Sequence, residues 1–532
     1  MKKELSLSAL FFFSISAIAI CQPVLIGELT GKEKIFTGFK NQLYFAAGSS
    51  IMVADITSKS IDLFVDLNEP VIHDKGASFT LNNFTRDMGT FLQFPVTESH
   101  IYFLTKPYKD SIRLWQSDGT PKGTKKIGVF DTIITYVEFK GALYFIAGKF
   151  NIGYELWKAD PSGVISPITQ LGLGKRPSYS TTFKSLIAGT SYLYCVFPDS
   201  LNNYRIYKSD GTQNGTTEIE LRTSNENEIQ ELTFFKEKLY FLNNDTLWVY
   251  DHSGLTFMPD PDPERIYNFI TKTSNHLFFS MSDLNLPYQL LYSTTGSFDD
   301  INLLFERDGY IRHLSIKDKL VICYKSDYAV SQLYVSDGTS KGTLEISKGF
   351  EEHEVPFLFS SAGDYLFFGQ DYGTPEYPFG SRVYDLMQSD LTPSGTVRVS
   401  SLYKDTTYYS FPNNFTEVNN TLFFTTSKPA NPETNYPELL YYYTPTSGQI
   451  TSNKMAQHKN LSVYPNPTSG YCSVETDLQG SYKLINSFGI VVSEEDFNQK
   501  IMLDMNLLTS GIYLLQMVSD KNETIITKIL KE

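Results

Sequence analysis

The sequence predicts an all-β protein: a β-propeller of eight or nine four-stranded blades followed by a small immunoglobulin-like β-sandwich. Three observations predict this fold class. A Leu-aromatic motif ending in Asp-Gly recurs along the chain, a Leu-Tyr-Phe motif precedes each copy, and aromatic residues make up 14% of the sequence. Aromatic side chains suit the pleated surface of strands. Four short strands in a unit of roughly 40 to 60 residues match the period of a propeller blade.

The clearest copy of the first motif is LWQSDGTPKGT, from Leu114 to Thr124. A catalytic site is needed once, whereas this pattern occurs nine times and has lost its aspartate twice. Asp bonds the backbone amides ahead of it and Gly accepts a positive φ, so the motif is predicted to turn the chain. The three tryptophans follow its leucine and are expected to pack between blades. The aspartate column is Asp55, Asp118, Asp160, Asp210, Asp251, Thr295, Asp337, Asp390 and Thr444.

The second motif supplies one buried strand to each unit. Stacked blades bury both faces of such a strand, and closure of the ring protects the ends. Nine units give nine blades, or eight if the first and last combine into one closing blade. The strands begin at Leu43, Ile101, Leu143, Leu193, Leu239, Leu277, Leu320, Leu366 and Leu422.

These repeats resemble a bacterial family with the consensus ELWKSDGTxxGT, found in secreted and surface proteins. The best matches are Glu155 to Asp160 and Leu114 to Thr124, and the resemblance covers roughly residues 30 to 450. It implies a propeller, expected over residues 22–445, and no defined activity.

The first 21 residues predict a secretory signal peptide. Lys2 and Lys3 precede an apolar run from Ala9 to Ile20, too short for a comfortable membrane span. Cleavage is expected before Gln22, and a lipid anchor on Cys21 is the alternative. No later stretch is apolar enough to span a membrane. The net charge of −14 and the lack of a Lys/Arg-rich run argue against a nucleic-acid partner.

A polar linker at 446–460 leads to a second domain at 461–532, whose alternating strands and turns predict a β-sandwich. The order YPNPTSG, INSFGIVV, LTSGIYLLQM and a basic last strand resembles the type A C-terminal sorting domain of the type IX secretion system. The resemblance implies handling by that machinery and a secreted or cell-surface location. An adhesion domain is the alternative. The residues that match the family pattern are Pro465, Asn466, Pro467, Gly489, Gly511, Tyr513, Lys528 and Lys531.

Repeated residues build the scaffold, so ligand binding is expected where the units differ. The departures are the extra length between Asp62 and Thr97, with His73-Asp74, and two hairpins at 370–380 and 427–437 in adjacent units. Exposed tyrosines beside carboxylates suit a sugar face or a peptide. Solvent-exposed hairpin tips stiffened by proline are the alternative. The candidate ligand-binding residues are Asp371, Tyr372, Glu376, Tyr377, Glu433 and Tyr436.

No catalytic residues, metal ligands or cofactors are predicted. Glu351 to Glu354 lacks a spaced metal-binding partner, and a stiff extended loop explains Pro259 to Glu264 without calcium. Cys195, Cys323 and Cys472 are expected in the core. We expect a secreted or surface binding module for a glycan or protein partner. The alternatives are a polysaccharide lyase or glycosidase, with Asp371, Glu376, Glu433 or Asp385 as its carboxylates, and a passive component of the surface layer.

Overall fold

The structure, a computed structural model, is built from β-strands, and among the described residues no helix is long and apolar enough to cross a membrane. The chain divides into two compact units, Ala19–Pro445 and Thr446–Glu532. The structure describes residues 23–29, 35–72, 93–107, 111–149, 153–169, 186–198, 204–221, 229–244, 246–258, 265–283, 288–297, 299–308, 310–325, 331–347, 355–373, 382–400, 412–427, 438–445, 462–486, 491–520 and 524–532.

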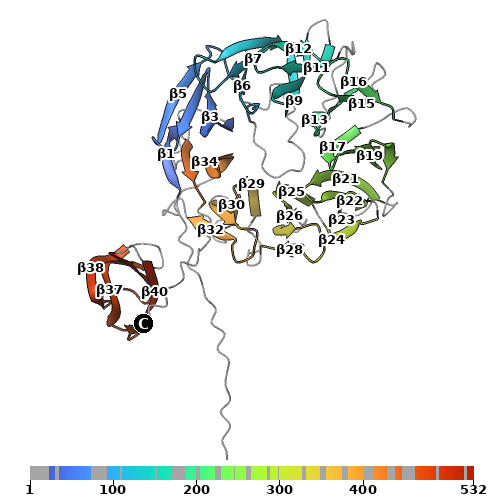
Figure 1. Ribbon diagram of the computed structural model, residues 1–532. Helices are drawn as coiled ribbons and strands as arrows, with labels where there is room; N and C mark the ends of the chain where they lie inside the picture. Colours follow the sequence, from blue (N-terminus) through green and yellow to red (C-terminus); the bar gives the residue numbers. More distant parts are fainter. Residues whose placement is uncertain are drawn as a thin grey trace, which may run out of the picture. The chain divides into compact units, whose positions relative to one another are not determined.

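The first unit is a ring of β-sheets (Figure 1), nine of them in the described residues, which we number as blades 1 to 9 in chain order. The strands of blades 1 to 5 are β2 (Phe36–Phe39), β3 (Gln42–Ala47), β4 (Ser50–Asp55) and β5 (Ser60–Asp66); β6 (Ile101–Thr105), β7 (Ile112–Ser117) and β8 (Lys125–Phe130); β9 (Thr132–Phe139), β10 (Ala142–Lys149), β11 (Gly153–Ala159) and β12 (Ile165–Pro167); β13 (Leu186–Ala188), β14 (Leu193–Pro198), β15 (Tyr204–Ser209) and β16 (Thr216–Ile219); and β17 (Ile229–Phe235), β18 (Lys238–Asn243), β19 (Thr246–Asp251) and β20 (Gly254–Phe257).

The remaining blades continue in the same order, except that the ninth includes the first strand of the chain. Blades 6 to 9 contain β21 (Arg265–Lys272), β22 (Leu277–Asp283), β23 (Tyr288–Thr294) and β24 (Asn302–Asp308); β25 (Tyr310–Ile316), β26 (Lys319–Lys325), β27 (Ser331–Ser336) and β28 (Leu344–Glu345); β29 (Val355–Ala362), β30 (Tyr365–Gly373), β31 (Arg382–Ser389) and β32 (Val397–Ser400); and β33 (Asn413–Val418), β34 (Thr421–Ser427), β35 (Glu438–Tyr443) and β1 (Val24–Leu29).

Each second strand is buried on both faces, as the Leu-Tyr-Phe motif predicts. In β3, Leu43, Tyr44 and Phe45 are all at most 1% exposed. Tyr44 packs with Phe103 of blade 2, whereas Leu43 and Phe45 pack in a cluster that includes residues of blade 9. Because neighbouring residues of a strand point to opposite faces, one strand seals two junctions between blades.

The ring closes between its first and last blades. Strand β1 pairs with β35 and so becomes the outer strand of blade 9, while β2 lies beside β33. A Cβ at Gly38 would lie 2.7 Å from the carbonyl oxygen of Glu417, so the two backbones meet closely. The first unit of the sequence therefore forms a blade of its own, and only its first strand, β1, belongs to the sheet of blade 9. The sequence leaves eight or nine blades open, and the described residues of the ring form nine sheets.

Blade 2 departs from the four-stranded pattern, because its sheet has three strands. Its innermost position is taken by residues 94–97, which hold β6 through a single bridge between Val96 and Ile101 and a bond from the Tyr102 amide to the Pro95 carbonyl. Proline has no amide proton to donate to a ladder, which limits pairing here.

The second unit is a sandwich-like five-stranded sheet around its own core. Its strands are β36 (Ser462–Tyr464), β37 (Tyr471–Asn486), β38 (Val491–Asp504), β39 (Gly511–Ser519) and β40 (Thr524–Lys531). The long β37 pairs with β36 along its first part and with β39 along its second, so it passes from one side of the core to the other. Cys472, Leu484, Phe497 and Leu515 are among the residues that fill this core.

Candidate ligand-binding surface

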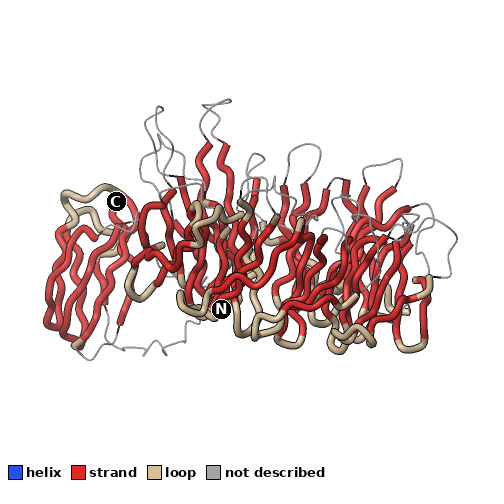
Figure 2. Tube along the Cα trace, turned by 90° about the horizontal axis from the view of Figure 1, so that it is seen from above, coloured by secondary structure: helices blue, strands red, loops and turns tan. Residues whose placement is uncertain are grey.

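The ring has two chemically different ends. In an antiparallel blade the turns after the first and third strands lie at one end, and the hairpin after the second strand lies at the other. We call these ends the turn face and the hairpin face. Figure 2 shows most of the described turns of the ring, in tan, along one edge.

The aspartate motif makes a repeated turn on the turn face. In blade 4 the Asp210 Oδ1 accepts the amide of Thr212 at 2.8 Å and its hydroxyl at 2.6 Å, and that hydroxyl accepts the Gly215 amide at 3.0 Å. The Thr212 hydroxyl and amide lower the pKa of the Asp210 carboxyl by stabilising its charge. A Cβ at Gly215 would lie 2.1 Å from the Asp210 carboxyl carbon, so the second glycine is sterically required. Asp118, Asp337 and Asp390 bond the threonine two residues ahead in the same way.

The same turns also join blades 2, 4 and 6 to the blade before each of them. The Tyr144 hydroxyl of blade 3 donates to the Gly211 carbonyl of blade 4 at 3.3 Å, and the Tyr240 hydroxyl of blade 5 reaches Gly296 of blade 6 at 3.4 Å. The Lys40 ammonium of blade 1 donates to the Asp118 carbonyl of blade 2 at 2.7 Å. The aspartate motif therefore serves both turning and blade stacking, and much of the polar chemistry of the turn face is used within the fold.

The predicted ligand-binding hairpins lie on the hairpin face of adjacent blades. Asp371 and Tyr372 are in β30 near its end, where Tyr372 pairs with Val383 of β31, and the corresponding end of blade 9 pairs Ser427 with Glu438. Blades 8 and 9 adjoin through β29 and β33. The described strand ends that lead into the two hairpins thus lie at one end of neighbouring blades. Glu376, Tyr377, Glu433 and Tyr436 lie outside the described residues, as do His73-Asp74, Glu351 to Glu354 and Pro259 to Glu264.

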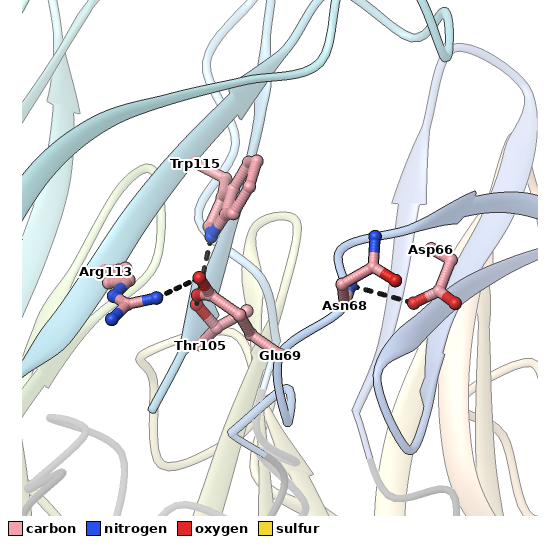
Figure 3. Close-up of polar contacts among 6 residues, drawn as sticks. All are labelled: Asp66, Asn68, Glu69, Thr105, Arg113 and Trp115. Carbon is pink, nitrogen blue, oxygen red and sulfur yellow. Dashed lines mark hydrogen bonds and ion pairs between the residues drawn. The ribbon is translucent and has the colours of Figure 1, made fainter. Parts of the chain in front are cut away.

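A polar network that the sequence analysis missed lies on the hairpin face of blades 1 and 2 (Figure 3). The Trp115 indole nitrogen donates to the Thr105 hydroxyl at 3.0 Å, and Thr105 donates to Glu69 Oε2 at 2.7 Å. The Arg113 guanidinium binds Glu69 Oε1, and both side chains are mostly buried. The turn before Glu69 is fixed by its own bond, from the Asn68 amide to Asp66 at 2.8 Å.

This network holds the start of the segment between Asp62 and Thr97, by which the first unit is longer than the others. The backbone of residues 71–72 follows the end of β6, with a bridge from Val71 to Thr105 and a bond from the Ile72 amide to the Leu104 carbonyl at 2.9 Å. Arg113 occupies the position that Glu155 fills in blade 3, directly before the motif leucine. That change of charge in a repeated column is a sequence signal that could have pointed to Arg113, although it names no partner.

The other candidate groups are structural. Cys195, Cys323 and Cys472 are buried and form no disulfide with one another, and burial raises the pKa of the Cys195 thiol far above its usual range. Glu155 is buried and accepts the Thr169 hydroxyl. In the described parts of the chain, no three His, Cys, Asp or Glu side chains converge as a metal site.

The matched residues of the second unit hold its last strand in place. The Asn466 side chain donates to the Lys528 carbonyl at 2.7 Å and accepts the Leu530 amide at 2.8 Å. Tyr513 is buried and its hydroxyl donates to the Thr509 carbonyl at 2.8 Å. Lys528 is exposed, whereas Lys531 is only 9% exposed and donates to the Ser469 carbonyl at 2.7 Å.

The family pattern has four further positions in the second unit. Pro465 and Pro467 are exposed on either side of Asn466, and Gly511 begins β39. Gly489 lies outside the described residues.

Several solved structures resemble the chain at low identity. The post-proline cleaving enzyme of Rickettsia typhi is 11% identical with a TM-score of 0.37, and the match covers 66% of this chain and 58% of that one. The β-propeller domain of the Trilobed protease of Pyrococcus furiosus is 12% identical with a TM-score of 0.33, covering 62% and 100%. PorZ of Porphyromonas gingivalis, a surface component of the type IX secretion system, is 9% identical with a TM-score of 0.25, covering 94% and 86%. No curated protein matches the sequence.

The family comparison concerns the second unit. Residues 462–532 match the family described as the secretion system C-terminal sorting domain. This range begins with β36 and ends with the last residue of the chain, so it includes the whole sandwich-like sheet. The protein is therefore a β-propeller that carries a C-terminal sorting domain of the type IX secretion system.

Proposed function

We propose that this protein is a secreted or surface-displayed binding module for a glycan or protein partner, exported through the type IX secretion system. The observation that carries the proposal is the sorting domain at 462–532 joined to a propeller. A sorting domain supports export, and a rigid ring with unequal loops at one end is a common frame for ligand binding.

The hairpin face is the proposed binding surface. The turn face uses Asp118, Asp210, Asp337 and Asp390 for repeated turns, whereas the hairpins differ from blade to blade. The network of Glu69, Thr105, Arg113 and Trp115 fixes the base of the longest departure from the repeat on that face. Tyrosines and carboxylates of the hairpins at 370–380 and 427–437 are the proposed contacts, because an aromatic ring with nearby acceptors suits sugar hydroxyls or a peptide.

Export is tested by removing the signal that would direct it. A chain that ends at residue 445 is expected to stay in the periplasm of a host with a type IX system, whereas the full chain reaches the surface or the medium. Protease accessibility on intact cells and immunoblots of the medium measure the distribution. Equal surface or medium levels of both chains would contradict the proposed export.

Ligand binding is tested on the exported protein with a glycan array. The double variant Tyr377→Ala/Tyr436→Ala is expected to lose at least tenfold in affinity for any glycan bound by the natural sequence. Tyr192→Ala is the matched control, because Tyr192 is 37% exposed and precedes β14 on the turn face. Equal loss in both variants, or none in either, would remove the hairpins from the proposal. Release of reducing ends from a bound polysaccharide would instead support the lyase or glycosidase alternative.

A further inference from the structure

The junction between blades 9 and 1 lacks the tyrosine and lysine contacts that join several other neighbouring blades. Tyr144 and Tyr240, and Lys40 and Lys236, reach the next blade's turn at other junctions. Blade 9 has Phe423 at the tyrosine position and Asn419 at the lysine position. The turn of blade 1 also differs from those of blades 2, 4 and 7, because Ile56 follows Asp55 where Gly119, Gly211 and Gly338 follow the aspartate.

A cavity of about 370 Å³ opens at this junction, on the turn face. Small-molecule sites commonly measure roughly 300 to 1,000 Å³, so this volume is at the lower end of that range. Its walls combine polar and apolar side chains. The lining residues are Lys40, Asn41, Gln42, Asp55, Ile56, Thr57, Val418, Asn419 and Phe423.

The two charged groups of the cavity have opposite signs, and each is hydrogen-bonded to the backbone within the fold. The Lys40 ammonium donates to the Asp118 carbonyl at 2.7 Å. Asp55 Oδ1 accepts the amides of Ser58, at 3.2 Å, and Thr57, at 2.6 Å, and these bonds lower the pKa of the Asp55 carboxyl. A ligand with a strong charge of either sign therefore meets one like and one opposite charge here.

The amide groups of the cavity remain available. Asn419 donates from Nδ2 to Asn41 Oδ1 across the junction. This bond leaves Asn41 Nδ2 as a donor and Asn419 Oδ1 as an acceptor, each without a partner among the described residues. A hydroxyl group both donates and accepts, so it matches such a pair better than a carboxylate or an ammonium does. Val418 and Phe423 are buried and give the cavity an apolar side.

We propose that the cavity between blades 1 and 9 binds a neutral sugar unit. The Asn41–Asn419 amide pair hydrogen-bonds the sugar hydroxyls, and Val418 and Phe423 contact the C–H face of the sugar ring. The site is separate from the hairpin face, so it would be a second glycan contact on the opposite end of the ring. Sites of this size bind with a few convergent polar groups and an apolar wall, which is the composition found here.

The proposal is tested on the full mature chain by saturation-transfer NMR. The probes are the methyl glycosides of glucose, galactose, mannose and N-acetylglucosamine, with methyl glucuronide as the charged comparison. Thr57→Tyr is designed to fill the cavity from an exposed position, and Ser58→Tyr is the matched control, because Ser58 is adjacent and does not line it. Asn419→Asp removes the donor that holds the Asn41–Asn419 pair together, with little change of size, and serves as the second variant if Thr57→Tyr does not fold.

At least one neutral glycoside is expected to bind the natural sequence and Ser58→Tyr equally, with at least tenfold weaker binding to Thr57→Tyr and Asn419→Asp. No binding by any of the four neutral probes, or unchanged binding in the folded cavity variants, would overturn the proposal. Tighter binding of the glucuronide would overturn the assignment of a neutral ligand. Tyr377→Ala/Tyr436→Ala leaves the cavity untouched, so failure of the hairpin-face proposal is distinguishable from failure here.

Discussion

The junction between blades 3 and 4 gives a direct test of the stacking role of the aspartate motif. Gly211 has a φ of +95° and its carbonyl accepts the Tyr144 hydroxyl of the preceding blade at 3.3 Å. A Cβ at this position would lie 2.4 Å from the Tyr144 hydroxyl oxygen. The substitution Gly211→Ala therefore strains the turn and also displaces the tyrosine that joins the two blades.

The expected cost has two parts. A non-glycine residue in this region of φ costs about 1–3 kcal/mol. Loss of the bond from Tyr144 adds about 0.5–1.5 kcal/mol, because the phenol is buried and would be left without its partner. Burial already raises the pKa of Tyr144 to about 12, so ionisation does not relieve the group at neutral pH. We expect Gly211→Ala to lower the free energy of unfolding of the propeller by about 2–4 kcal/mol.

Gly141→Ala is the matched control. Gly141 has a φ of +78°, and no atom lies within 4 Å of the Cβ that alanine would add. It should therefore show the backbone cost alone, about 1–2 kcal/mol. Urea unfolding of the full mature chain, followed by tryptophan fluorescence and calorimetry, measures both variants. Equal destabilisation would show that the contact with Tyr144 contributes nothing and would refute the stacking role of the turn.

Three further predictions follow from the same contacts. Gly38→Ala would place a Cβ 2.7 Å from the carbonyl of Glu417, so it should cost about 1–3 kcal/mol and speed amide exchange in β2 and β33. The lowered pKa of Asp210 contributes stability that is present above the unfolded value and lost as pH falls, so the natural sequence should lose stability below about pH 4, and Asp210→Asn should lose less on acidification. Asn466→Ala removes both bonds to the backbone of β40 and should destabilise the sorting domain by about 1–3 kcal/mol, with faster exchange of the Leu530 amide, whereas Asn506→Ala, whose amide bonds stay within one turn, should change little.

Repetition explains why so much of the propeller could be predicted. One strand motif and one turn motif recur nine times, and the copies at Asp118, Asp210, Asp337 and Asp390 make the same local bonds, so a pattern such as Asp-Gly-Thr carries its own geometry. The burial of Leu43, Tyr44 and Phe45 follows from the stacking that the period implies. The packing of Trp157 is of the same kind, because it is buried in the cluster shared by blades 2 and 3.

Contacts between residues that occur once could not be read from the sequence. Glu69 and Arg113 are 44 residues apart and meet because blades 1 and 2 adjoin. The bond between Asn41 and Asn419 spans 378 residues and exists because the ring closes at that point. Neither pair has a spacing or a motif, so the fold had to be known first. The same reasoning applies to the ninth blade, whose outer strand comes from Val24–Leu29.

The unequal use of the two ends of the ring explains how such a scaffold can hold a variable surface. The turns of Asp118, Asp210, Asp337 and Asp390 fix the third strand to the fourth, and contacts such as Tyr144 with Gly211 fix one blade to the next. Both kinds of contact lie at the turn face. Lengthening a hairpin at the other end therefore costs little beyond loop-closure entropy, which grows slowly with length. At the junction of blades 9 and 1, Phe423 and Ile56 occupy the positions of Tyr144 and Gly211 in the junction of blades 3 and 4, and the turn face there leaves a cavity that could hold a ligand.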